Sequence, residues 1–325
     1  MEAAATTSAP RFQGRLRPRN ESYEALLARL SHQSVVKHYD AYGDIAWDSP
    51  EFAIDPDDTR WALPPSDTLG ATSWYQAQPQ SVQTRIGLHS TACKMRIGVE
   101  FESVLKRGLL EYAATLPSDA PELRYAYHEV IEEAQHSLMF SEFVTRTGMQ
   151  VPGLPARIQR AARHVVGLGR RFPELFFIFV LGGEEPIDHA QREALRSSED
   201  IHPLLRRIMQ IHTTEEARHL CFAREYLRRT VPALGAVRKV VLQLEAPFIL
   251  SQMARLMMQA PDYVVRTYGI PDEVVRQAYT RNRDHRRMVH ESLESVRLLC
   301  VELGIVGPGW TQKLWRRLGI WPKGA

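Results

Sequence analysis

Two short segments carry the same pattern of metal-binding side chains. They read EEAQH at residues 132–136 and EEARH at residues 215–219. In each, a Glu and the His three residues later lie about one turn apart on one face of a helix, so the carboxylate and the imidazole can bind one metal ion. Four-helix bundles that bind two irons use this pair on two helices, with a lone Glu from each of two others. The alternative is that both pairs arose by chance on solvated helices. We favour the metal site, and the repeat then predicts four ligands: Glu133, His136, Glu216 and His219.

The same architecture requires a lone carboxylate on the helix before each motif. Before the first motif, Glu102 shares a face with apolar residues, whereas Glu100 is rotated about 200° away at about 100° per residue. Before the second motif, Glu184 and Glu185 follow the apolar run FFIFVLGG, where a charge is costly to bury without a partner. We favour Glu102 and Glu185, and the choice between Glu184 and Glu185 stays open.

Further polar residues lie beside these ligands. His212 precedes Glu216 by four residues on the same helical stripe, so we interpret it as a seventh ligand; the alternative is a structural histidine bonded to a backbone carbonyl. Glu132 and Glu215 would point towards neighbouring helices, where they could accept the free N–H of a ligand histidine and fix its tautomer. Ordinary surface carboxylates are the alternative. Asp188, one turn after Glu185, could act in the same way.

The donor set indicates the metal. Four carboxylates and three imidazoles, without a thiolate, form an oxygen-rich site that excludes thiolate zinc and iron–sulfur centres and suits a pair of iron or manganese ions. Four carboxylates also neutralise two divalent ions, which makes burial of the centre tolerable. We therefore expect two iron ions, with manganese as an alternative, and chemistry with O2.

The elements that position these residues are predicted to be helices. Pro121, Pro173 and Pro203 stand where a first helical turn favours proline, and convincing strand alternation with hairpin turns is absent. The fold class is therefore all-α, with helices long enough for a bundle. The expected helices span residues 23–40, 80–115, 121–146, 173–197, 203–229, 234–258 and 271–303, with a shorter helix before residue 173.

Composition bounds the remaining organisation. We expect a disordered arm over residues 1–20, a helical metal-binding domain over 21–305 and a basic, aromatic tail over 306–325. A net charge of +3, from 41 basic and 38 acidic side chains, is too small to indicate nucleic-acid binding. The three scattered cysteines are typical of a reduced, cytoplasmic protein. The apolar runs are too short or too interrupted to cross a membrane, so we expect no transmembrane segment.

The order and spacing of the motifs resemble those of the p-aminobenzoate N-oxygenase (AurF-type) family of di-iron arylamine oxygenases, within the ferritin-like superfamily. The likeness covers about residues 30–303 and rests on the FE pair ending at Glu102, the first EExxH, LGGEEPID, and HxxxExxH from His212. It implies that Glu133 and Glu216 bridge the irons. Glu102 and His136 would serve one iron, and Glu185, His212 and His219 the other. The implied reaction oxygenates an amine to a hydroxylamine, using O2 and an electron donor such as ferredoxin or a reductase, with a homodimer as a candidate assembly.

One departure concerns the substrate pocket. The family's p-aminobenzoate enzyme holds the substrate carboxylate with an arginine on a late core helix, whereas this region reads RNRDHRRMVHESLESVR here. Arg286 and His290 are pocket candidates, together with His285 and Arg287; ordinary helix-surface charges are the alternative. Two other functions fit the same ligands. One is a di-iron C–H hydroxylase or desaturase acting on a lipid or carrier-bound substrate. The other is ferritin-like metal storage, although storage proteins have shorter chains.

Overall fold

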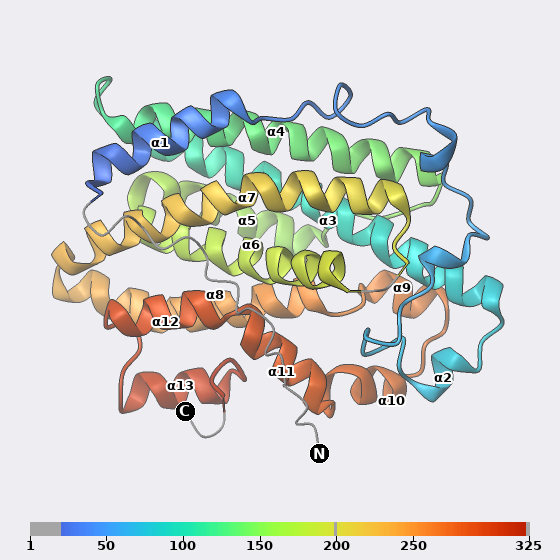
Figure 1. The fold of residues 1–325 in the computed structure, drawn as a ribbon. Coiled ribbons are helices and arrows are strands. Elements are labelled where there is room, and N and C mark those ends of the chain that lie inside the picture. Colours follow the sequence, from blue (N-terminus) through green and yellow to red (C-terminus); the bar gives the residue numbers. More distant parts are fainter. Residues whose placement is uncertain (1–20, 198–199, 323–325) are drawn as a thin grey trace, which may run out of the picture.

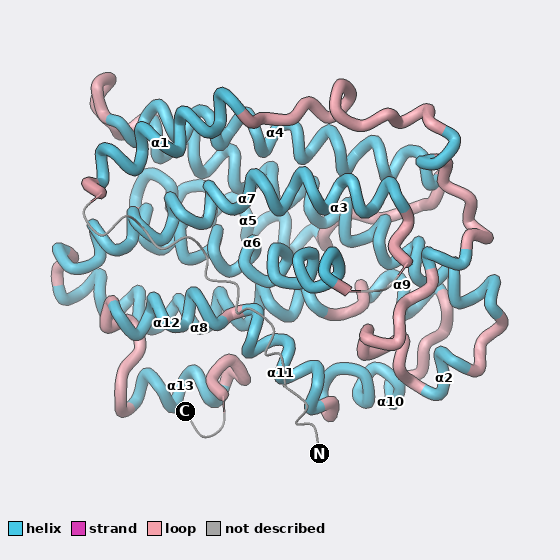
Figure 2. Tube along the Cα trace, viewed as in Figure 1, coloured by secondary structure: helices cyan, strands magenta, loops and turns pink. Residues whose placement is uncertain are grey.

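The computed structural model describes residues 21–197 and 200–322, so the expected arm over residues 1–20 lies outside the described part of the chain. The described residues form helices joined by loops, and none of them forms a β-strand (Figure 2). The predicted all-α class is therefore confirmed. No helix in the described ranges is long and apolar enough to cross a lipid bilayer.

Four long helices form the centre of the fold and run side by side (Figure 1). They are α3 (Gln80–Ala113), α4 (Pro121–Thr147), α6 (Pro173–Arg196) and α7 (Pro203–Thr230). Helix α3 packs against α4, and α6 packs against α7, with further contacts of α3 on α6 and α4 on α7. The four elements that carry the predicted ligands are thus the four walls of one bundle, which is the arrangement that di-iron bundles use.

Local sequence signals explain where these helices begin and end. Pro121, Pro173 and Pro203 each occupy a first-turn position, where the missing N–H has no helical partner to lose. Gly148 ends α4 in the left-handed conformation, with φ of 61°, which costs a glycine little. Pro186 lies inside α6 without ending it. The boundaries of the central helices therefore agree closely with the sequence prediction.

The other helices surround this centre. Helix α1 (Tyr23–Val36) packs on α4 and α7; α5 (Ala156–Arg171) packs on α3 and α6; α8 (Ala236–Met258) packs on α6 and carries α13 (Trp310–Arg317). The remaining helices are α2 (Ser73–Gln76), α9 (Asp262–Thr267), α10 (Asp272–Val275), α11 (Arg283–Ser292) and α12 (Glu294–Glu302). In the tail, Trp315 of α13 is fully buried, so the helix is anchored by an aromatic side chain.

Two expected helices differ from the structure. The first ends at Val36 rather than at residue 40, because the chain leaves the helix and the Tyr39 N–H donates to the Glu215 carboxylate at 3.1 Å. The segment predicted as one helix over 271–303 is broken into α10, a π-turn over Arg276–Thr280, α11 and α12. Asn282 caps α11 with its side-chain oxygen, which gives this helix a start of its own.

A close approach between α3 and α6 brings two of the bundle walls together. A Cβ atom at Gly183 would lie 2.2 Å from the Phe101 ring, so only glycine permits this contact. Gly183 directly precedes Glu184 on α6, and Phe101 directly precedes Glu102 on α3. The contact therefore fixes the separation of two carboxylates at the centre of the bundle.

Candidate metal centre

Seven buried side chains from the four central helices converge on one point. They are Glu102 on α3, Glu133 and His136 on α4, Glu184 on α6, and His212, Glu216 and His219 on α7. In four overlapping groups of three drawn from this set, each residue offers a ligand atom within 4.8 Å of the others. His219 joins through Nδ1, which lies 3.0 Å from both Glu133 Oε1 and Glu216 Oε1.

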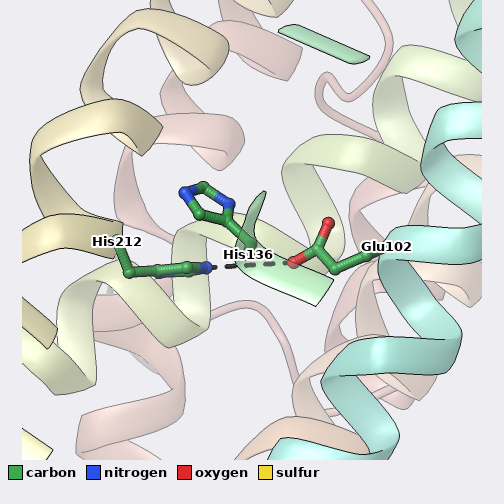
Figure 3. A group of neighbouring side chains, drawn as sticks. All are labelled: Glu102, His136 and His212. Carbon is green, nitrogen blue, oxygen red and sulfur yellow. Dashed lines mark ion pairs between the residues drawn. The ribbon is translucent and has the colours of Figure 1, made fainter. Parts of the chain in front are cut away.

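Figure 3 shows how three of these side chains face one another across the bundle. His212 Nε2 points at Glu102 Oε1 over 3.9 Å, and His136 lies between their helices. The rings of His136 and His212 have centroids 4.7 Å apart. The spacing is too long for a direct hydrogen bond between His212 and Glu102, but it suits two donors to one ion.

The structure places Glu184, and not Glu185, in this cluster. Glu184 belongs to two of the groups above, whereas Glu185 lies about 100° further round α6. There its Oε1 accepts hydrogen bonds from the Arg224 guanidinium at 2.7 and 2.9 Å, and its Oε2 accepts the Val296 N–H at 2.9 Å. Glu185 thus satisfies a free N–H in the first turn of α12. The sequence analysis favoured Glu185 as the lone carboxylate of this helix, whereas the geometry favours Glu184.

Each of two histidines is held by a carboxylate from the opposite helix. His136 on α4 places Nδ1 3.0 Å from Glu133 Oε2 and Nε2 2.9 Å from Glu215 Oε2 on α7. His219 on α7 places Nε2 2.7 Å from Glu132 Oε2 on α4. Donation from Nε2–H leaves Nδ1 facing the cluster in both rings, the arrangement by which an outer carboxylate fixes a ligand tautomer. Glu132 and Glu215 therefore lie where the sequence analysis expected them.

His212 is oriented by an amide that the sequence analysis missed. Its Nδ1 lies 3.0 Å from the side-chain oxygen of Gln191, and its Nε2 makes no hydrogen bond although it is buried. Gln191 follows Glu184 by seven residues, two turns along one face of α6, so the same helical stripe that selects Glu184 also points to Gln191.

The cluster leaves several buried polar atoms without hydrogen-bond partners. They are Glu102 Oε2, Glu133 Oε1, both oxygens of Glu184, Glu216 Oε2 and His212 Nε2. Buried polar atoms are normally paired because an orphaned one costs about 1–3 kcal/mol. Two divalent ions would give these atoms partners, and the four carboxylates would supply four negative charges to balance them. The residues present therefore fit a two-metal centre.

Comparison with known proteins agrees with this geometry. The pattern of the family described as P-aminobenzoate N-oxygenase AurF matches residues 20–304. The chain belongs to this family. Uncharacterized proteins of Mycobacterium tuberculosis (strain H37Rv) and Mycobacterium bovis are each 39% identical to it over 286 residues, which span 88% of this chain and 84% of the relative. The family is an oxygenase family of di-iron enzymes, so membership supports an oxidoreductase with a buried metal site.

Without metal, burial and mutual repulsion shape the protonation of this AurF-family centre. Burial raises the pKa of Glu102 well above its ordinary value, and the neighbouring Glu133 charge adds to the rise. The pKa of Glu184 is raised for the same reasons, burial first and then the Glu216 charge. Burial opposes protonation of His136, but its hydrogen bonds with Glu133 and Glu215 outweigh burial and raise its pKa to about 10. The metal-free centre therefore holds protons that bound metal would displace.

His212 differs from the other two histidines in its charge. Burial lowers its pKa well below the ordinary value, and the nearby His136 charge adds to the effect. Its ring is therefore neutral, with Nε2 free to bind a metal ion.

Three of the predicted supporting residues lie elsewhere. The Asp188 carboxylate pairs with Arg192 at 2.7 Å, not with a histidine, and Arg192 in turn donates to the Thr213 carbonyl. Arg286 is exposed and donates to the Thr280 carbonyl, and His290 Nε2 donates to the Gly319 carbonyl. The structure does not bring these three side chains to the cluster. Arg286 lies at the helix surface, as the alternative interpretation expected.

One further buried carboxyl group lies on the ligand face of α4. Glu129 precedes Glu133 by four residues, and both of its oxygens are buried without a hydrogen-bond partner. Burial raises its pKa to about 8. The stripe Glu129, Glu133 and His136 has the same spacing as His212, Glu216 and His219 on α7. This spacing is the signal that sequence reasoning could have used to find Glu129.

Proposed function

We propose that this protein is a non-haem di-iron oxygenase that uses O2 to oxidise the nitrogen of a small amine. The observation that carries the proposal is the third histidine, His212, whose unpartnered Nε2 points into a carboxylate cluster that already holds two Glu-x-x-His pairs. Family membership supports the same reaction class. Two irons bound here would supply the electrons and the binding site with which O2 is activated.

The ligands proposed for the irons are the seven residues of the cluster. Glu102, Glu133, Glu184 and Glu216 balance the charge of two divalent ions. Glu132 and Glu215 hold His219 and His136 with Nδ1 towards the centre, and Gln191 holds His212. How the ligands divide between the two irons stays a prediction.

The residues around the centre also keep bulk water away. The seven cluster residues are at most 2% exposed, as are Glu132 and Glu215. Low local dielectric strengthens the interactions of the ions with their ligands and limits loss of reactive oxygen to solvent. In the proposed reaction, an amine, O2, two electrons and two protons give a hydroxylamine and one water.

The test loads metal-free protein with Fe(II) under anaerobic conditions and measures the iron bound per chain. The loaded protein then receives either O2 with a reductant or hydrogen peroxide, with p-aminobenzoate and a long-chain acyl substrate offered in parallel. We expect about two irons per chain and a hydroxylamine that carries one oxygen from labelled O2. Glu216→Ala should lose both metal and product, whereas the exposed control Glu245→Ala should keep both.

Other outcomes separate the alternatives. Oxidation of the acyl chain with the amine untouched would replace the proposal with a hydroxylase or desaturase. If the protein assembles into a cage, binds two irons per chain and oxidises neither compound, the result would indicate metal storage. One zinc per chain, or no iron after loading, would contradict the di-iron centre itself.

A further inference from the structure

Helix α5 carries an unusual set of charges. Its sixteen residues, ARIQRAARHVVGLGRR, include five arginines and one histidine and no acidic residue. The apolar side chains Ile158, Val165, Val166 and Leu168 are partly buried, whereas the basic side chains are exposed. The helix thus presents one apolar face to the protein and one uniformly basic face to its surroundings.

The basic face is not neutralised within the described chain. Arg157, Arg160 and Arg163 follow one another at three-residue spacing, where like charges repel. None of the three forms an ion pair with a described residue; the only hydrogen bond of Arg160 is to the Ala156 carbonyl in its own helix. Arg170 is the exception, with a long contact of 3.9 Å to Glu111. A concentration of positive charge of this kind favours an acidic partner.

Helix α5 lies directly over the two helices that carry the lone carboxylates of the centre. It packs on α3 and α6, which hold Glu102 and Glu184. A Cβ at Gly169 would lie 2.0 Å from the Gly108 carbonyl oxygen, so α5 touches the α3 backbone. Packed helix axes are about 8–10 Å apart. The basic face is therefore separated from the metal centre by a single layer of helix.

The proposed oxygenation consumes two electrons in each turnover, and the cysteines of the described chain offer no iron–sulfur site that could store them. Its cysteines, Cys93, Cys221 and Cys300, are free and scattered, so they do not form an iron–sulfur site. The electrons must come from another molecule that reaches the surface near the centre.

We propose that the basic face of α5, defined by Arg157, Arg160, Arg163, Arg170 and Arg171, docks a small acidic electron-transfer protein. The inference rests on the proposed oxygenase function. Two one-electron transfers would occur in succession. Each would oxidise the cofactor of one partner molecule and reduce one iron from the ferric to the ferrous state. A helix of sixteen residues is about 24 Å long, which suits the small interfaces of transient electron-transfer complexes.

The test uses a reduced, acidic plant-type [2Fe–2S] ferredoxin as the probe. Its binding to the full chain is measured by calorimetry with and without iron, and its rate of oxidation by the iron-loaded protein is measured by stopped-flow absorbance. The variant is Arg157→Glu/Arg160→Glu/Arg163→Glu. The matched control, Arg283→Glu/Arg316→Glu/Arg317→Glu, reverses three arginines that are far along the chain and have no ion pair with a described residue.

We expect the α5 variant to weaken binding and slow electron transfer by about tenfold to a hundredfold at low salt, with the same effect in binding to the iron-free protein. The difference should shrink near 0.15 M salt, where the screening length is about 8 Å. The control should match the wild-type protein. Circular dichroism and iron content should be the same in all three, because the exchanged side chains lie at the surface.

Equal behaviour of the α5 variant and the control would overturn the docking site. A second result would also overturn it: the full chain binds vesicles of phosphatidylglycerol through α5 and does not bind ferredoxin. That result would assign the basic face to a membrane. Peroxide-driven oxidation of the amine by the wild-type protein tests the oxygenase function separately, because peroxide needs no electron donor. Product from peroxide without ferredoxin binding would therefore leave the function in place and remove only the docking site.

Discussion

Glu129→Gln should make the metal-free protein less sensitive to rising pH. Glu129 is fully buried, and neither of its carboxyl oxygens has a hydrogen-bond partner. Burial raises its pKa from an ordinary 4.5 to about 8; the His219 charge opposes the rise, and the nearby carboxylates add to it. Glutamine has nearly the shape of the neutral acid but cannot ionise, so the substitution removes the pH-dependent cost of forming a buried charge.

The size of the effect follows from the two pKa values. The folded protein binds this proton more tightly than the unfolded chain, so the stability it gives is complete below pH 4.5 and is lost as the pH rises through about 8. At about 1.4 kcal/mol per pH unit, the loss is about 3 kcal/mol by pH 7 and approaches 5 kcal/mol above both values. The variant, with a glutamine side chain at this position, would not incur this loss.

The assay is urea unfolding of metal-free protein, followed by circular dichroism at about pH 5.5, 7 and 8.5. Glu102 and Glu184 add pH dependence of the same sign to both proteins, so the informative quantity is the difference between Glu129→Gln and the wild type. This difference should grow with pH in favour of the variant, while the exposed control Glu245→Gln should follow the wild type. A constant difference across this range would refute the assignment of Glu129 as a neutral buried acid.

Two further predictions test the assignment of ligands. Glu184→Ala should lower the iron content. Glu185→Ala should keep the iron and lower the free energy of unfolding by about 2 kcal/mol, because Arg224 and the start of α12 lose charge-assisted hydrogen bonds. Loss of iron in Glu185→Ala but not in Glu184→Ala would make Glu185 the ligand. His212→Ala should fold normally by circular dichroism and lose iron affinity at one site. Gln191→Leu should show a smaller loss of iron affinity, about tenfold. Undiminished iron in both variants would make His212 a structural residue.

The sequence alone determined the parts of this protein that depend on local spacing. Proline and glycine positions mark the central helices, because their backbone limits act within one turn. The repeated Glu-x-x-His motif identified four side chains that converge in the fold, since residues three apart share a helix face wherever that helix packs. Glu102 could be chosen over Glu100 because apolar neighbours define the buried side of α3. Glu132 and Glu215 could be placed beside the histidines, because each adjoins a predicted ligand in the sequence.

Only the tertiary structure decided between Glu184 and Glu185. The apolar residues before this pair are buried on every side of α6, so they define no single inner face. The contact of Gly183 with Phe101 and the capping of α12 by Glu185 fix the rotation of the helix, and both contacts join distant segments. The break between α11 and α12 was not predicted either, because the Glu185 carboxylate that accepts the Val296 N–H in the first turn of α12 lies on a distant segment of the chain.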